Sequence, residues 1–129
     1  MTAILKPSNG EDLRVNWWKW RPTVSLLGRA GILPAGERTE RCLANGCGGY
    51  LTDDEAQRAA DHVDSLLAEL APDERILMDG ERTAEERRTT RVPISQWNDE
   101  DVRQVYSADR PWLAQFSAFC RRSRGFTVI

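Results

Sequence analysis

One stretch of the chain decides the fold: residues 52–70 read TDDEAQRAADHVDSLLAEL. Thr52 and Glu55 have the spacing of a capping box, in which each side chain accepts a hydrogen bond from the backbone N–H of the other residue. Pro72 cannot continue a helix. Apolar residues recur between these limits at steps of three and four, at Ala56, Ala59, Ala60, Val63, Leu66, Leu67 and Leu70. The stretch therefore predicts an amphipathic helix over residues 52–71 with one face against a core.

A second helix of the same character is predicted over residues 109–124. Ser107 or Asp109 can cap it, Pro111 fits its first turn, and Gly125 ends it. Its apolar stripe consists of Trp112, Leu113, Phe116, Phe119 and Cys120. Because each of the two helices has one apolar face to bury, we expect them to pack together.

Short strands and minor helices are expected around this pair. The strands are predicted at Leu13–Trp18, at Arg75–Met78 and at Phe126–Ile129, and we place them together at one side of the helices. Further helices are predicted from Pro22 to Ala30, from Glu37 to Ala44, and from Asp99 to Tyr106 with Asn98 as its cap. The fold class that follows is α+β, a mainly helical single domain with a small number of short strands.

The domain is expected to span residues 13–129, since a chain of 129 residues has the size of one domain. Residues 1–12 contain the turn formers Pro7-Ser8-Asn9-Gly10 and no periodic apolar pattern, which indicates a flexible N-terminal leader. Residues 81–91 are mostly charged and polar and are predicted to be an exposed connection.

Composition excludes several classes of protein. The 18 Lys and Arg nearly balance the 20 Asp and Glu, and a net charge of −2 gives no general reason to expect nucleic acid or a membrane as partner. No apolar run approaches the roughly 20 residues of a membrane span, and Ala3-Ile4-Leu5 is too short for the apolar part of a signal peptide. We therefore expect a cytoplasmic protein whose three cysteines are reduced thiols.

Charge is unevenly distributed along the chain. Residues 52–74 hold eight acidic residues and one basic residue, Arg58. Asp54, Asp61 and Asp64 fall on the solvent side of the predicted helix. Such a face is usually only solvated. The alternative is a docking surface for a protein partner with a basic surface.

Three tryptophans, Trp17, Trp18 and Trp20, lie within four residues. Tryptophans supply much of the core area in a small domain, and we expect one or two of the three to be buried. An exposed remainder would suit a protein partner better than single-stranded nucleic acid, because only Lys19 and Arg21 add local positive charge. Trp18 and Trp20 are therefore candidate partner-binding residues.

The sequence contains candidate residues for three kinds of chemical site: a phosphate-binding loop, a zinc site and a nucleophilic site. The loop Asn45–Gly49 before a helix has the glycines of a phosphate-binding loop, but Asp53, Asp54 and Glu55 would repel phosphate. Cys42 and Cys47, with His62 and Cys120, lack the tight paired spacing of zinc ligands. Cys47 with His62 remains the one alternative for nucleophilic catalysis. We expect no metal, no cofactor and no catalytic residue.

Four segments resemble a loose group of small, uncharacterised bacterial proteins. They are the segment from Val15 to Pro22, the segment Asn45–Gly49 with Thr52–Ala56, the segment Ile76–Gly80, and the segment from Phe116 to Val128. The resemblance implies a bacterial cytoplasmic domain that stands alone, and some members of such groups look like immunity or accessory proteins. It implies no catalytic residue.

The resulting hypothesis is a noncatalytic protein-binding module that uses its acidic helix face or its exposed tryptophans. Two alternatives stay open: a small enzyme with a Cys47/His62 site, and a structural homodimer that completes its core across a symmetry axis.

Overall fold

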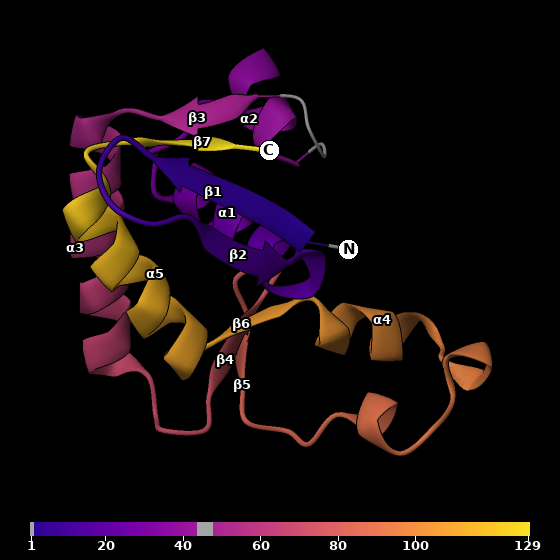
Figure 1. Ribbon diagram of the computed structural model, residues 1–129. Coiled ribbons are helices and arrows are strands. Elements are labelled where there is room, and N and C mark those ends of the chain that lie inside the picture. The colour runs from indigo at the N-terminus through magenta and orange to yellow at the C-terminus, as the bar shows by residue number, and fades with distance from the viewer. Residues whose placement is uncertain (1, 44–47) are drawn as a thin grey trace.

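The computed structural model describes residues 2–43 and 48–129, with the side chain of Leu43 left out. Five α-helices and two small antiparallel sheets form the described part of the chain (Figure 1). Most of the buried apolar side chains make one continuous core that runs from Ala3 to Val128. The predicted class, a single, mainly helical α+β domain, is confirmed.

The first sheet has the strand order β2-β1-β7-β3. Its strands are β1 (Thr2–Pro7), β2 (Leu13–Asn16), β3 (Gly49–Leu51) and β7 (Phe126–Val128). Strand β1 lies inside the sheet because it pairs with β2 on one side and with β7 on the other. Residues 2–7 of the flexible leader predicted for residues 1–12 instead form this strand, with Ala3 and Leu5 fully buried. Its alternation of buried and exposed residues is short and is followed by turn formers, which concealed it.

Helix α1 (Trp17–Arg29) begins directly after β2. The Asn16 side chain caps it by accepting a hydrogen bond from the Lys19 backbone N–H at 3.0 Å. The predicted strand Leu13–Trp18 therefore ends two residues early, and the helix starts well before Pro22. Pro22 lies within the helix, and it costs the helix one backbone hydrogen bond because it has no N–H.

Helices α3 (Asp53–Glu69) and α5 (Arg110–Ser123) stand side by side at one end of the molecule, as predicted (Figure 1). The Thr52–Glu55 capping box is present, and Asp109 caps α5. Val63, Phe116 and Phe119 are buried between the elements, whereas Leu67 is half-buried at the edge. The two amphipathic stripes thus meet as their periodicity requires.

Helix α2 (Glu37–Leu43) packs against β3. The final residue of the predicted 37–44 helix, Ala44, lies outside the described residues. An ion pair between Arg38 and Glu55, with Nη2 and Oε2 2.6 Å apart, connects α2 to the first turn of α3. Burial raises the pKa of the Glu55 carboxyl, but hydrogen bonds from Arg38 and Thr52 outweigh it and lower the pKa overall.

The second sheet has the order β5-β4-β6. It consists of β4 (Arg75–Leu77), β5 (Arg82–Thr83) and β6 (Ser107–Asp109). The strand predicted at Arg75–Met78 is present, but it belongs to this separate sheet and does not join the strands at 13–16 and 126–128. After β5 the chain makes a long excursion that includes the helix predicted near residue 99. It then returns as β6, which pairs with β4.

That excursion, residues 84–106, is called the arm. It extends away from the body in Figure 1 and contains two 3₁₀ turns, η1 (Arg88–Thr90) and η2 (Ile94–Gln96), and helix α4 (Asp99–Val105). Asn98 caps α4 through a second capping box with Asp101. Across residues 2–43 and 48–129, no helix combines the length and the apolar character needed to cross a bilayer.

Candidate functional site

Aromatic side chains form a partly exposed cluster at the base of the arm. Trp18, in the first turn of α1, packs on Tyr106 with ring centroids 4.6 Å apart and meets Trp97 edge-on at 6.3 Å. Trp18 remains 38% exposed. The expectation that one of the clustered tryptophans reaches the surface is therefore met by Trp18.

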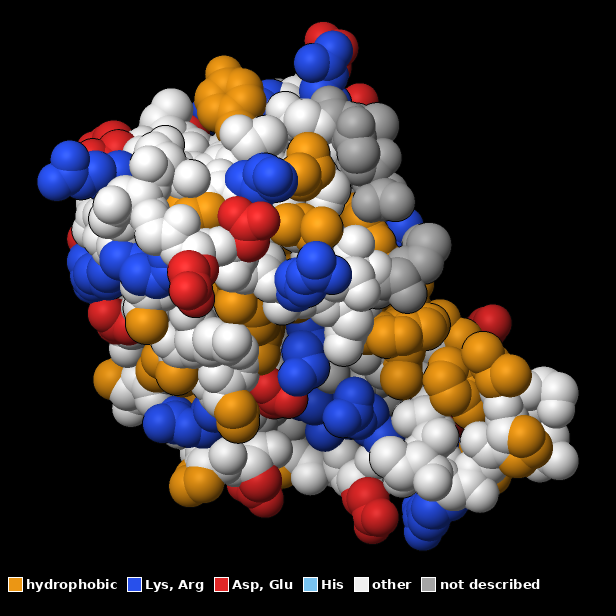
Figure 2. Space-filling view, in the orientation of Figure 1, with side chains coloured by type: hydrophobic (Ala, Val, Ile, Leu, Met, Phe, Trp, Pro, Cys, Tyr) orange, Lys and Arg blue, Asp and Glu red, His pale blue; other side chains and the backbone are white. Residues whose placement is uncertain are grey.

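Further apolar side chains extend this surface along the arm. Val102 lies one helical turn before Tyr106 and is 42% exposed, and Ile94 beside Trp97 is 70% exposed. Figure 2 shows hydrophobic side chains gathered over the arm, next to a group of Lys and Arg side chains where the arm meets the body. We call Trp18, Ile94, Trp97, Val102 and Tyr106 the arm surface.

Polar contacts fix the arm that carries this surface. The Trp97 indole Nε1 donates to the Val92 carbonyl oxygen at 3.1 Å. Arg88 binds both carboxylate oxygens of Asp101, at 3.0 and 3.1 Å. The Asp101 carboxylate also accepts from the Asn98 N–H, and this bond, followed by Arg88, lowers the Asp101 pKa. The turns before α4 are thereby tied to the helix itself.

Buried Arg75 joins the arm to the second sheet. Its guanidinium donates to the Glu85 carbonyl oxygen at 2.7 Å and to the Gln104 side-chain oxygen at 2.6 Å. Burial lowers the pKa of Arg75, with the charge of Arg87 as a further cause. The arm is consequently held from both of its ends, by Arg75 and by the contact of Trp18 with Tyr106.

Trp20, the other tryptophan predicted to bind a partner, is fully buried. Its Nε1 donates to the Cys42 carbonyl oxygen at 2.8 Å, and its ring packs against Phe116 and Phe126. Trp20 is a core residue and does not reach the surface, because the strand ends at Asn16 and the helical spacing turns Trp18 and Trp20 in different directions.

The three carboxylates of the acidic face, Asp54, Asp61 and Asp64, are exposed on α3 as predicted. Two of them form ion pairs with Arg121, whose Nη2 lies 2.7 Å from Asp61 Oδ1 and 2.9 Å from Asp64 Oδ2. The Ser117 hydroxyl also donates to Asp64, and this bond, followed by Arg121, lowers the Asp64 pKa. Much of the acidic face thus serves to join α3 to α5.

Of the Cys47/His62 pair considered for catalysis, the structure describes only His62, which lies on α3. Cys42 and Cys120 are buried, and burial raises the pKa of the Cys42 thiol to about 11 and also raises that of Cys120. Cys47, with most of the glycine-rich loop, lies outside the described residues. Within residues 2–43 and 48–129, no cluster of three or more His, Cys, Asp or Glu side chains could hold a metal ion.

Sequence reasoning missed most of the arm surface. Ile94 and Trp97 stand in a polar segment, and Val102 and Tyr106 are spaced by four residues on one face of a short charged helix. The spacing of Val102 and Tyr106 was the sequence signal that could have indicated this surface. No protein-family model, curated protein or solved structure matches this chain in the three comparisons.

Proposed function

We propose that the protein is a noncatalytic protein-binding module and that the arm surface is its contact site. The observation that carries the proposal is the exposure of Trp18, Ile94 and Val102 around the Trp18–Tyr106 contact. Tryptophan and tyrosine are enriched among the residues that contribute most to protein interfaces. The partner would present apolar side chains, for example one face of an amphipathic helix.

The fixed geometry of the arm supports this function. Trp18, Trp97 and Tyr106 already contact one another, and Trp97 is hydrogen-bonded to Val92. Side chains that are ordered before binding lose less conformational entropy when a partner covers them. A preformed aromatic surface of this kind therefore favours recognition over a purely structural role for the arm.

The acidic face of α3 is a second candidate contact, for a partner with a basic surface. Asp53 and Asp54 are exposed in the first turn of α3, and no described basic residue forms an ion pair with either carboxylate. Asp61 and Asp64, by contrast, would have to exchange Arg121 for the partner. The carboxylates that support this second contact site therefore lie at the N-terminal end of α3.

The test compares two variants in affinity purification from the source cell, with quantitative mass spectrometry. Val102→Asp places a charge on the exposed arm surface, and Asp54→Lys reverses a charge on α3. We expect a specific protein that is retained by the wild type and by Asp54→Lys but lost by Val102→Asp. Loss with Asp54→Lys alone would instead assign the contact to the acidic face.

Two controls complete this experiment. Circular dichroism and thermal melting must show that Val102→Asp remains folded, which its exposed position favours. Light scattering of the purified chain decides whether the partner is a second copy: a dimer that Val102→Asp dissociates would assign the arm surface to self-association. Equal retention of every protein by both variants would reject both contact sites.

A further inference from the structure

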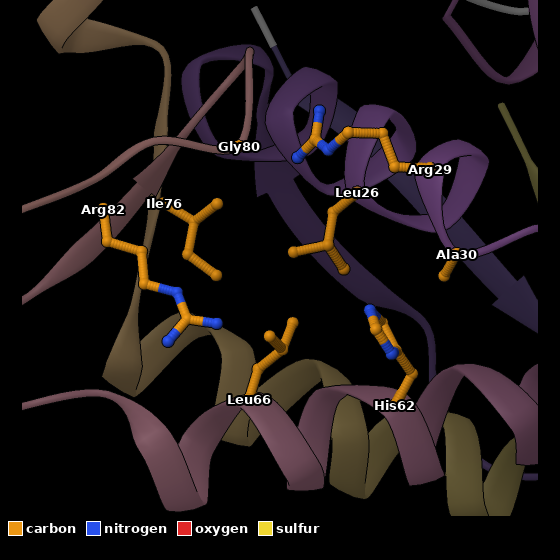
Figure 3. Close-up of a pocket in the computed structure, with 8 residues that line it drawn as sticks. All are labelled: Leu26, Arg29, Ala30, His62, Leu66, Ile76, Gly80 and Arg82. Carbon is orange, nitrogen blue, oxygen red and sulfur yellow. The ribbon is translucent and has the colours of Figure 1, made fainter.

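A small hollow lies between α1, α3 and the β4–β5 hairpin (Figure 3). Its volume is about 160 Å³, and Leu26, Leu66 and Ile76 form its apolar part. Leu26 and Ile76 are buried, so these side chains belong to the core beneath the hollow. A cavity of about 150 Å³ lined by apolar side chains accommodates a benzene molecule. The hollow therefore has room for a single ring or a branched chain of similar size.

The side chain of Arg29 reaches the edge of this hollow from the end of α1. Its Nη1 donates to the Met78 carbonyl oxygen at 2.6 Å. It also lies against Gly80, where a Cβ atom would come within 2.9 Å of Arg29 Nε. Because Gly80 has no side chain, the Arg29 guanidinium can lie directly beside its backbone. None of the described carboxylates forms an ion pair with Arg29, so its charge is available to a ligand.

A second guanidinium, that of Arg82, approaches from β5. Its Nη2 lies 2.8 Å from Glu69 Oε2, and both side chains are more than one third exposed. An exposed ion pair of this kind contributes little free energy, so a ligand carboxylate can compete with Glu69. Figure 3 shows Arg82 on the side of the hollow opposite Arg29 and His62.

His62 contributes a polar ring to the edge of the hollow on the side of Arg29. It projects from α3 toward α1 in Figure 3 and also lines a neighbouring hollow together with Ala30 and Arg58. The side chains that line the first hollow thus include two guanidinium groups and an imidazole. No acidic side chain of the described residues lines it.

We propose that this hollow binds a small-molecule monocarboxylate with a compact apolar body. The body would lie against Leu26, Leu66 and Ile76, and the carboxylate would meet Arg82, whose planar guanidinium matches carboxylate geometry, while Arg29 adds positive charge from the opposite edge. This hollow and the arm surface share no residue, so the two sites are independent of each other.

Benzoate is the probe, because its ring has the size of the hollow and it carries one negative charge. Titrating it into the ¹⁵N-labelled full-length chain should give saturable shifts of the amide signals of His62, Leu66 and Arg82. Benzyl alcohol has a similar size but no charge. It should bind about tenfold more weakly, since it lacks the charge-assisted hydrogen bonds.

Two exposed variants sharpen the test because they move the affinity in opposite directions. Arg82→Gln should weaken benzoate binding about tenfold, whereas Glu69→Gln should strengthen it by releasing Arg82 from its competing carboxylate. Arg14→Gln, on the exposed side of β2, is the matched control and should leave the affinity unchanged.

The proposal is overturned by any of three results. The first is no saturable shift around the hollow in the wild type. The second is equal affinity for benzoate and benzyl alcohol. The third is a change in the same direction for Arg82→Gln and Glu69→Gln, with the dispersion of both spectra showing that the variants are folded.

Discussion

The indole of Trp18 packs on the phenol ring of Tyr106 with centroids 4.6 Å apart, which joins the first turn of α1 to the end of α4. Trp97, which precedes α4, contacts the same indole edge-on. Trp18 is therefore both an exposed residue of the candidate contact site and the residue on which the arm rests. Recognition and arm stability are expected to depend on the same side chain.

Replacing Trp18 by alanine should loosen the arm. Losing the contacts with Tyr106 and Trp97 should lower the free energy of unfolding by about 1 kcal/mol. Hydrogen exchange of the α4 amides should accelerate more than that of the α3 amides, because the lost contacts involve Trp97 and Tyr106, which flank α4. Trp18→Phe keeps an aromatic ring and is the control. Unchanged exchange in α4 would show that Trp18 does not hold the arm.

The α3–α5 pair was predictable because its signals are local. The Thr52–Glu55 capping box, the apolar spacing that includes Val63, and Pro72 all act within a few residues of one another. The same holds for the cap of α5 and for the glycine after it. Helix positions followed from these residues, and their packing followed from the need to bury two apolar stripes.

The missed elements depend on contacts between distant residues. Strand β1 pairs with β7 near the opposite end of the chain, with Leu5 opposite Val128. No local sequence pattern predicts that pairing. The arm surface likewise needs Tyr106 to return to Trp18. The sequence patterns predicted which helices form. They did not predict which side chains come together in the connections between the helices.

Stability should fall at low pH through Asp64. The Ser117 hydroxyl, followed by Arg121, lowers its folded-state pKa, whereas the unfolded value is about 3.9. The resulting stability is present above the unfolded pKa and is lost as the pH falls through the folded pKa. Urea unfolding below about pH 4 should therefore show a smaller acid loss for Asp64→Asn than for the wild type.

The control for this pH dependence is Asp54→Asn, because no described residue forms an ion pair with Asp54. This variant should keep the acid loss of the wild type. If Asp64→Asn and the wild type lose stability in parallel between pH 6 and pH 2, the contacts of Asp64 with Ser117 and Arg121 do not contribute to the pH dependence of the free energy of unfolding.

The buried thiols should resist alkylation in the folded state. Burial raises the pKa of Cys42 to about 11 and raises that of Cys120 as well, so little thiolate forms near neutral pH and neither sulfur is accessible. Iodoacetamide at neutral pH followed by peptide mass spectrometry should find Cys42 and Cys120 unmodified until denaturant is added. Rapid labelling of Cys42 in the native chain would contradict the packing of α2 against β3.

Two glycine substitutions should move stability in opposite directions. At Gly49 an added Cβ would lie 2.7 Å from the Arg41 carbonyl carbon and closer still to the Cys42 backbone nitrogen. Backbone atoms cannot move aside as a flexible side chain does, so Gly49→Ala should lower the free energy of unfolding by about 1–3 kcal/mol.

Gly28 offers the matched case, because it lies in α1 and the nearest atom to an added Cβ, the Leu33 carbonyl oxygen, is 4.0 Å away. Gly28→Ala should raise the free energy of unfolding by about 0.5–1 kcal/mol, since alanine loses less backbone entropy in a helix. Urea denaturation of both variants measures the difference. A Gly49→Ala chain as stable as Gly28→Ala would mean that α2 and β3 do not approach each other as closely as the structure shows.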